Sequence, residues 1–222
     1  MSLDFPRFQV FLNYPFDGNA ESISLAMHFA VASAGLLPVC AWDLTSPDRS
    51  RLSVLETAIS SCQYSLHDLS TSTNENESPR LNVPFELGGV LFQALRNQNQ
   101  GHRCAFFVTS SSALNKSFSD LAGMDPLLYD TDTALLVKTY EWLRDTVHAA
   151  FNPRPSVDVA DLYARLKRDL MRLRGSGRNG RPTHNEAQEV MYRIAAESGL
   201  WDWRVIRAGQ LAFPELPLAW AE

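Results

Sequence analysis

Short apolar runs rich in β-branched and aromatic residues alternate with amphipathic helical patterns along the first 151 residues of this 222-residue chain. The runs that predict strands are FQVFLNY (8–14), LLPVCAW (36–42), CQYSLHDL (62–69), RCAFFVT (103–109) and the shorter DPLLYD (125–130). Helices between strands are typical of parallel pairs, because a parallel neighbour can be reached only by a crossover connection. The sequence therefore predicts an α/β fold, a flavodoxin-like doubly wound sheet of five parallel strands.

The pattern changes after NPRPS (152–156), where two prolines interrupt the chain. From there the apolar residues recur only at helical spacing, first over residues 157–175 and again over residues 185–199. We therefore expect two parts, an α/β domain in residues 1–151 and a helical extension in residues 152–222.

Composition limits the partners and the compartment. The 20 basic and 25 acidic residues give a net charge of −5, which disfavours electrostatic binding of nucleic acid over a large surface. A small molecule or a protein is therefore the expected binding partner. Cys40, Cys62 and Cys104 lie in apolar runs, and an odd number of cysteines cannot all pair within the chain. We expect buried thiols in a reducing cytoplasm. The chain shows no signal pattern and no apolar run of about 18 residues, so we expect a soluble protein without a membrane span.

Common metal and nucleotide motifs are missing from the sequence. The histidines show neither HxxxH nor a Cys/His ligand spacing, so the sequence predicts no zinc site. The first strand is not followed by GxGxxG, and no GxxxxGK motif occurs, so the usual dinucleotide and triphosphate cradles are absent and no cofactor is predicted. His67 could be catalytic, but alternation along CQYSLHDL makes a packed strand histidine an equally good interpretation.

A carboxylate, Glu86, interrupts the otherwise apolar helical pattern NVPFELGGVLFQALRNQ (82–98). Pro84 suits the first position of a helix, which would put Glu86 in the first turn. In an open parallel sheet, that turn lies beside the crevice beyond the carboxyl ends of the strands, where ligands bind. Two interpretations stay open: Glu86 is a functional group of that crevice, or it only complements the helix dipole.

Three segments follow strand ends at the same crevice: NYPFD (13–17), WDLTSPDR (42–49) and HDLS (67–70). A polar stretch, STSTNENESPRLN (70–82), separates the last of them from the helix of Glu86. Long polar insertions in compact α/β domains are more often functional than accidental. We expect this stretch to be a mobile lid over a pocket in which Glu86 lies near Asp68 or the NYPFD loop.

Three segments, FQVFLNYPFD (8–17), ISSCQYSLHDLS (59–70) and NVPFELGGVLFQA (82–94), together resemble the Toll/interleukin-receptor (TIR) and nucleoside deoxyribosyltransferase-like group of Rossmann-type domains. The resemblance covers about residues 7–108. The matching residues are Asn13, Tyr14, Pro15, Phe16 and Asp17 in the opening loop, Asp68 after a later strand, and Glu86 with Gly88 in the glutamate helix.

Both families cleave N-glycosidic bonds, so the resemblance implies a hydrolase or transferase that acts on a nucleotide or nucleoside. NAD is then a candidate substrate rather than a cofactor, and the protein a candidate effector in bacterial antiviral defence or toxicity. The resemblance implies that Glu86 is the catalytic carboxylate, close to the anomeric carbon of an oxocarbenium-like sugar. It implies that Asp68 holds a ribose hydroxyl or tunes Glu86 by like-charge repulsion.

The candidate substrate-binding residues are Asn13, Tyr14, Phe16 and Asp17 in the matching loop, together with Arg80 from the polar stretch 70–82. The two aromatic rings would stack on a base, and the guanidinium would meet a phosphate. Simpler roles stay open for Asp68 as a turn cap, for the two aromatic residues as core, and for Arg80 as a solvated loop residue. A non-catalytic TIR-like module that senses a nucleotide or assembles with copies of itself also stays open.

Overall fold

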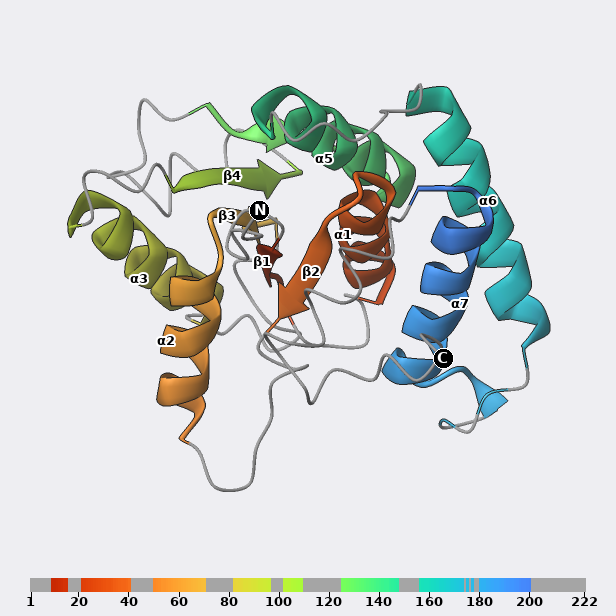
Figure 1. The fold of residues 1–222 in the computed structure, drawn as a ribbon, viewed down its shortest axis with the longest axis horizontal. Helices are drawn as coiled ribbons and strands as arrows, with labels where there is room; N and C mark the ends of the chain where they lie inside the picture. The colour runs from red at the N-terminus through yellow and green to blue at the C-terminus, as the bar shows by residue number, and fades with distance from the viewer. Residues whose placement is uncertain are drawn as a thin grey trace, which may run out of the picture.

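The central sheet consists of the parallel strands β1 (Gln9–Asn13), β2 (Leu37–Cys40), β3 (Tyr64–Asp68), β4 (Arg103–Val108) and β5 (Leu127–Leu128). They are hydrogen-bonded in the order β2-β1-β3-β4-β5 (Figure 1). Since β2 and β3 pair with opposite edges of β1, the direction in which strands are added reverses between β1 and β3. The flavodoxin-like doubly wound sheet predicted from the sequence is confirmed.

The computed structural model describes residues 9–15, 21–40, 50–70, 82–96, 102–109, 125–147, 156–173, 175, 177 and 180–200. Its helices are α1 (Glu21–Ser33), α2 (Arg51–Ser61), α3 (Asn82–Arg96), α5 (Asp132–Thr146), α6 (Ser156–Arg172) and α7 (His184–Glu197). Helices α1 and α5 pack together on one face of the sheet, while α2 and α3 cover the other (Figure 1). No helix within these ranges is both long and apolar enough to cross a membrane.

The predicted C-terminal helices form a further layer over one face of the domain. Helix α6 packs against α5 and α1, and α7 packs against α6 and α1 (Figure 1). The helical character predicted for residues 157–175 and 185–199 is therefore confirmed, while the boundary at residue 152 stays a prediction.

The apolar core consists of two clusters of buried side chains packed on the sheet. Strands β1 and β3 are buried along their whole length, because helices cover both faces of the sheet. The larger cluster joins the sheet to α1, α5, α6, α7 and one side of α2, and it includes Val10, Phe29, Leu135, Tyr163 and Met191. A smaller cluster lies beneath α3 and consists of Leu69, Val83, Leu87, Phe106 and Val108.

Helix α3 begins earlier than the sequence suggested. It starts at Asn82, so Pro84 is its third residue and Glu86 its fifth, and no acidic residue lies in the first turn. The first four N–H groups of a helix have no intrahelical partner, so a proline at the third position removes no hydrogen bond. The expectation that Glu86 lies in the first turn was therefore wrong. Glu86 is buried on the same side of α3 as Val83 and Leu87.

Candidate functional site

The candidate site lies at the carboxyl edge of the sheet, where the strand order reverses. Asn13 ends β1, Asp68 ends β3, and the register pairs Asn13 with His67. In doubly wound sheets this edge is where ligands bind. Two of the predicted site residues therefore meet at the point that the topology favours.

The amide of Asn13 ties the two strand ends to helix α3. Its Nδ2 donates to Nδ1 of His67 over 2.9 Å and to the carbonyl oxygen of Val83 over 2.9 Å. A carbonyl oxygen can only accept, so this contact fixes which end of the amide carries the hydrogens. The other end, Oδ1 of Asn13, is buried and has no hydrogen-bond partner within the described ranges.

A chain of hydrogen bonds leads from Asn13 back beneath α2 and α3. Nδ1 of His102 lies 3.1 Å from the carbonyl oxygen of Cys62, so Nδ1 carries the hydrogen and Nε2 accepts from the hydroxyl of Ser65 over 2.9 Å. The oxygen of Ser65 then accepts from Nε2 of His67 over 2.9 Å, and Nδ1 of His67 accepts from Asn13. Each imidazole therefore holds one hydrogen in a defined position.

Burial keeps both histidines of this chain neutral. Burial, together with a smaller effect of His102, lowers the pKa of His67 to about 3. Burial also lowers the pKa of His102, against the opposing effect of its hydrogen bond to the carbonyl oxygen of Cys62. The alternation along β3 that made His67 a candidate for a packed strand histidine is reflected in its complete burial.

Asp68 is enclosed by hydrogen-bond donors. Its Oδ1 accepts from the backbone N–H of Ser70 over 3.1 Å and from the hydroxyl of Tyr129 over 3.0 Å, while its Oδ2 accepts from Oγ of Ser70 over 2.9 Å. Burial raises the pKa of Asp68, and these bonds oppose that rise. Burial and the Asp68 carboxyl also raise the pKa of Tyr129. Asp68 thus joins the end of β3 to the segment after β5.

Asp68 and Glu86 approach this edge from opposite sides of the sheet. Successive side chains of a strand point to opposite faces. The side chain of His67 accepts from Asn13, which is bonded to α3, so His67 points to the α3 face. The next residue, Asp68, therefore points to the face covered by α1 and α5, where it accepts from Tyr129. Glu86 lies on α3, about one turn beyond Val83, and is 5% exposed. The contact between Asn13 and Val83 links the helix of Glu86 to the end of β1.

Tyr14 points toward α1 rather than toward α3. Its hydroxyl donates to Sγ of Cys40 over 3.7 Å and accepts from Oγ of Ser24 over 2.9 Å, and its ring meets the edge of His28. Tyr14 is nearly fully buried, which matches the alternative role in the core. The other predicted binding residues, Phe16, Asp17 and Arg80, lie outside the described residues, as do residues 71–81 of the predicted lid.

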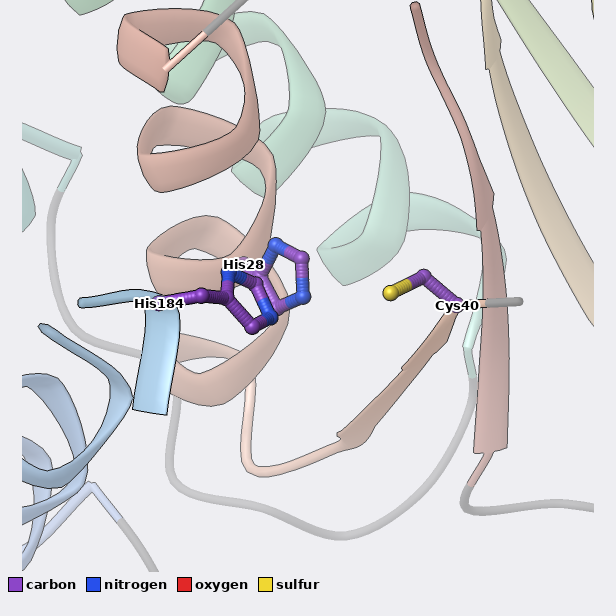
Figure 2. A group of neighbouring side chains, drawn as sticks. All are labelled: His28, Cys40 and His184. Atoms are coloured by element: carbon purple, nitrogen blue, oxygen red, sulfur yellow. The ribbon is translucent and has the colours of Figure 1, made fainter. Parts of the chain in front are cut away.

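The structure also gathers three residues that the sequence did not connect. His28, Cys40 and His184 each offer one ligand atom within 4.8 Å of the others, and Figure 2 shows the sulfur of Cys40 pointing toward the two imidazole rings. They come from α1, β2 and α7, so no short sequence spacing reveals them. Ser65 and Tyr129 were missed as well; alternation along CQYSLHDL was the available signal for Ser65, since it shares a face with His67.

No protein-family model, curated protein or solved structure matches this chain. What the site can do therefore follows from its own residues and their geometry.

Proposed function

We propose that the edge where β1 and β3 end binds a nucleoside or nucleotide, and that Glu86 promotes cleavage of its N-glycosidic bond. NAD is one candidate substrate, and the step uses no bound cofactor. The protein would act on a small molecule in the cytoplasm, a reducing compartment in which Cys40, Cys62 and Cys104 remain free thiols as they are in the structure.

The observation that carries the proposal is the buried Oδ1 of Asn13. A buried acceptor without a hydrogen bond costs about 1–3 kcal/mol, so such an atom is a natural place for a donor supplied by a ligand. A ribose hydroxyl is such a donor. Both hydrogens of Nδ2 are used by His67 and Val83, so Oδ1 is held in place before any ligand arrives.

The chemistry requires a carboxylate near the sugar. Cleavage breaks the bond between the anomeric carbon and the base nitrogen; the base leaves with the electron pair, and positive charge develops on the sugar. Glu86 either stabilises that charge or forms a bond to the anomeric carbon, and water or a second base then takes up the sugar. Its position on the helix held by Asn13 supports this assignment.

Asp68 has a supporting role in this proposal. Both of its oxygens accept hydrogen bonds from Ser70 or Tyr129, so we assign it to holding the loop after β3 in position. This is closer to the alternative of a turn cap than to direct contact with the sugar. Asp68→Asn should therefore reduce base release less than loss of the Glu86 charge does.

The test measures release of free base by chromatography after incubation with nucleosides, nucleotides and NAD. Glu86→Gln keeps the shape of the side chain but removes its charge, so base release should fall by about a hundredfold or more. The matched control is Glu56→Gln, which removes a carboxylate from the exposed side of the neighbouring helix α2 and should leave the rate unchanged. Circular dichroism of each variant checks that it is folded.

If base release by the wild type is unaffected by Glu86→Gln, another carboxylate carries the chemistry.

The second candidate function is a non-catalytic module that senses a nucleotide. The enclosure of Asp68 favours this candidate, because both oxygens of this predicted catalytic carboxylate accept hydrogen bonds from protein groups. The sensing module would be supported if the wild type released no base from any substrate, yet bound a nucleotide with an affinity that Glu86→Gln weakens.

A further inference from the structure

Three side chains of the kinds that bind transition metals meet between α1, the end of β2 and the start of α7 (Figure 2). His28 and Cys40 are buried, and His184 is half-buried. The rings of His28 and His184 meet edge to face with their centroids 5.4 Å apart. A thiol and two imidazoles are thus held together largely away from water.

We propose that His28, Cys40 and His184 bind one Zn²⁺ ion. Thiolate and imidazole are ligands that zinc prefers, in a tetrahedral arrangement with bonds of about 2.3 Å to sulfur and about 2.0–2.1 Å to nitrogen. These bond lengths place neighbouring ligand atoms roughly 3.3–3.6 Å apart. The three ligand atoms lie within 4.8 Å of one another, so side-chain rotations that bring them closer by about 1 Å complete the site.

Neighbouring groups hold two of the ligands in states that suit a metal. Nδ1 of His28 donates to the carbonyl oxygen of Ser24 over 2.8 Å, which leaves the lone pair on Nε2. The hydroxyl of Tyr14 donates to Sγ of Cys40, and Oγ of Ser24 donates in turn to Tyr14. Metal-binding histidines commonly donate their second N–H to a carbonyl oxygen, and a donor beside the sulfur favours its thiolate form.

The third ligand, His184, is positioned by its own helix. It is the first residue of α7, and Gln188, one turn later, contacts its Nε2 over 3.0 Å. A bound ion would therefore fasten the start of α7 to α1 and to the end of β2. Three protein ligands leave the fourth tetrahedral position to water.

In the experiment, a chelator strips the protein of metal, and after dialysis Zn²⁺ is titrated in competition with a chromophoric chelator. Mass spectrometry measures the metal content. We expect one zinc per chain and a higher melting temperature for the zinc-loaded protein. Cobalt replaces zinc as a spectroscopic probe, and a thiolate-to-cobalt charge-transfer band should appear. Cys40→Ser should remove that band, and His184→Ala should weaken zinc binding by about a hundredfold or more.

His184→Ala guards against a folding artefact, because His184 is half-buried whereas Cys40 is fully buried. The matched control is Cys104→Ser, which removes a half-buried thiol in β4 outside the group and should leave zinc affinity and the cobalt band unchanged. The proposal is overturned if the wild type binds no stoichiometric zinc. It is equally overturned if Cys40→Ser and His184→Ala bind zinc as tightly as the wild type.

Discussion

Helices α1 and α3 cover opposite faces of the same sheet, yet they have different surroundings. Residues 26–33 of α1 are all buried, since the sheet lies on one side and α5, α6 and α7 pack against the others. Helix α3 has one buried side, and on its outer side Phe85 and Phe92 are 65% and 67% exposed. A helix buried all round belongs to the interior, whereas an amphipathic one belongs to the surface.

Buried polar groups occur on both faces of the sheet. Asp68 and the group of His28, Cys40 and His184 lie on the side of α1. The chain of Asn13, His67, Ser65 and His102 lies on the face covered by α2 and α3. Buried polar groups cost stability unless they are paired, and the Oδ1 of Asn13 is a buried acceptor at the end of this chain. The two helices therefore differ in how deeply they are buried, and not in whether buried polar groups lie beside them.

The largest expected effect compares one phenylalanine from each helix. Phe29 of α1 is fully buried, with its ring centroid 5.9 Å from that of Tyr163 in α6, so Phe29→Ala should lower the free energy of unfolding by about 3–5 kcal/mol. Phe92→Ala removes the same atoms from the exposed side of α3 and should change it by less than about 0.5 kcal/mol. Urea denaturation of both variants measures the difference. Similar losses would mean that the outer side of α3 is covered, by another part of the chain or by a second copy.

The next prediction concerns acid stability on the α3 face. The pKa of His67 falls from 6.5 to about 3 on folding, so below pH 6.5 the unfolded chain binds a proton that the folded chain does not. The stability from this group is complete above pH 6.5 and is lost as the pH falls toward 3, by roughly 2 kcal/mol between pH 6.5 and 5.

His67→Gln should remove this part of the pH dependence, because a neutral amide does not titrate. Denaturation curves between pH 7.5 and pH 5 compare the slopes, so a constant loss of stability in the variant does not affect the result. His102, whose pKa is lowered too, contributes a slope of the same sign in both proteins. An equal acid slope in wild type and variant would show that His67 is not held neutral by burial.

Sequence reasoning reached the fold because the alternation of strands and helices is local. The same alternation made a buried His67 one of two open interpretations, and strand ends brought Asn13 and Asp68 to one edge. The partners of Asp68 could not be found this way, because Tyr129 follows a different strand and reaches Asp68 only in the folded sheet. The sequence analysis placed the start of α3 at Pro84, whereas the helix begins at Asn82. A proline is tolerated anywhere among the first helical residues, so it does not fix the start of a helix.

The group of His28, Cys40 and His184 could not be predicted from the sequence, because its members come together only in the folded protein. Its members belong to a helix, a strand end and a second helix of the C-terminal extension, and only the packing of α7 against α1 brings them together. A ligand spacing within one helix or one hairpin is visible in a sequence, but a site assembled from three separate elements is not.

The smallest expected effect tests whether the outer layer is part of the stable α1 face. Thr183 caps α7: its Oγ1 accepts from the backbone N–H of Glu186, whose carboxylate accepts in return from the backbone N–H of Thr183 over 2.7 Å. If α7 unfolds together with the core, Thr183→Ala should lower the free energy of unfolding by about 1 kcal/mol, and Thr183→Ser, which keeps the oxygen, should lower it less. Urea denaturation of the two variants gives the comparison. Equal free energies of unfolding for the wild type and both variants would mean that α7 unfolds before the core does. Only the sheet, α5 and α6 would then bury α1 at the point where the core unfolds. The difference in burial between α1 and α3 would be smaller at that point than it is in the folded structure.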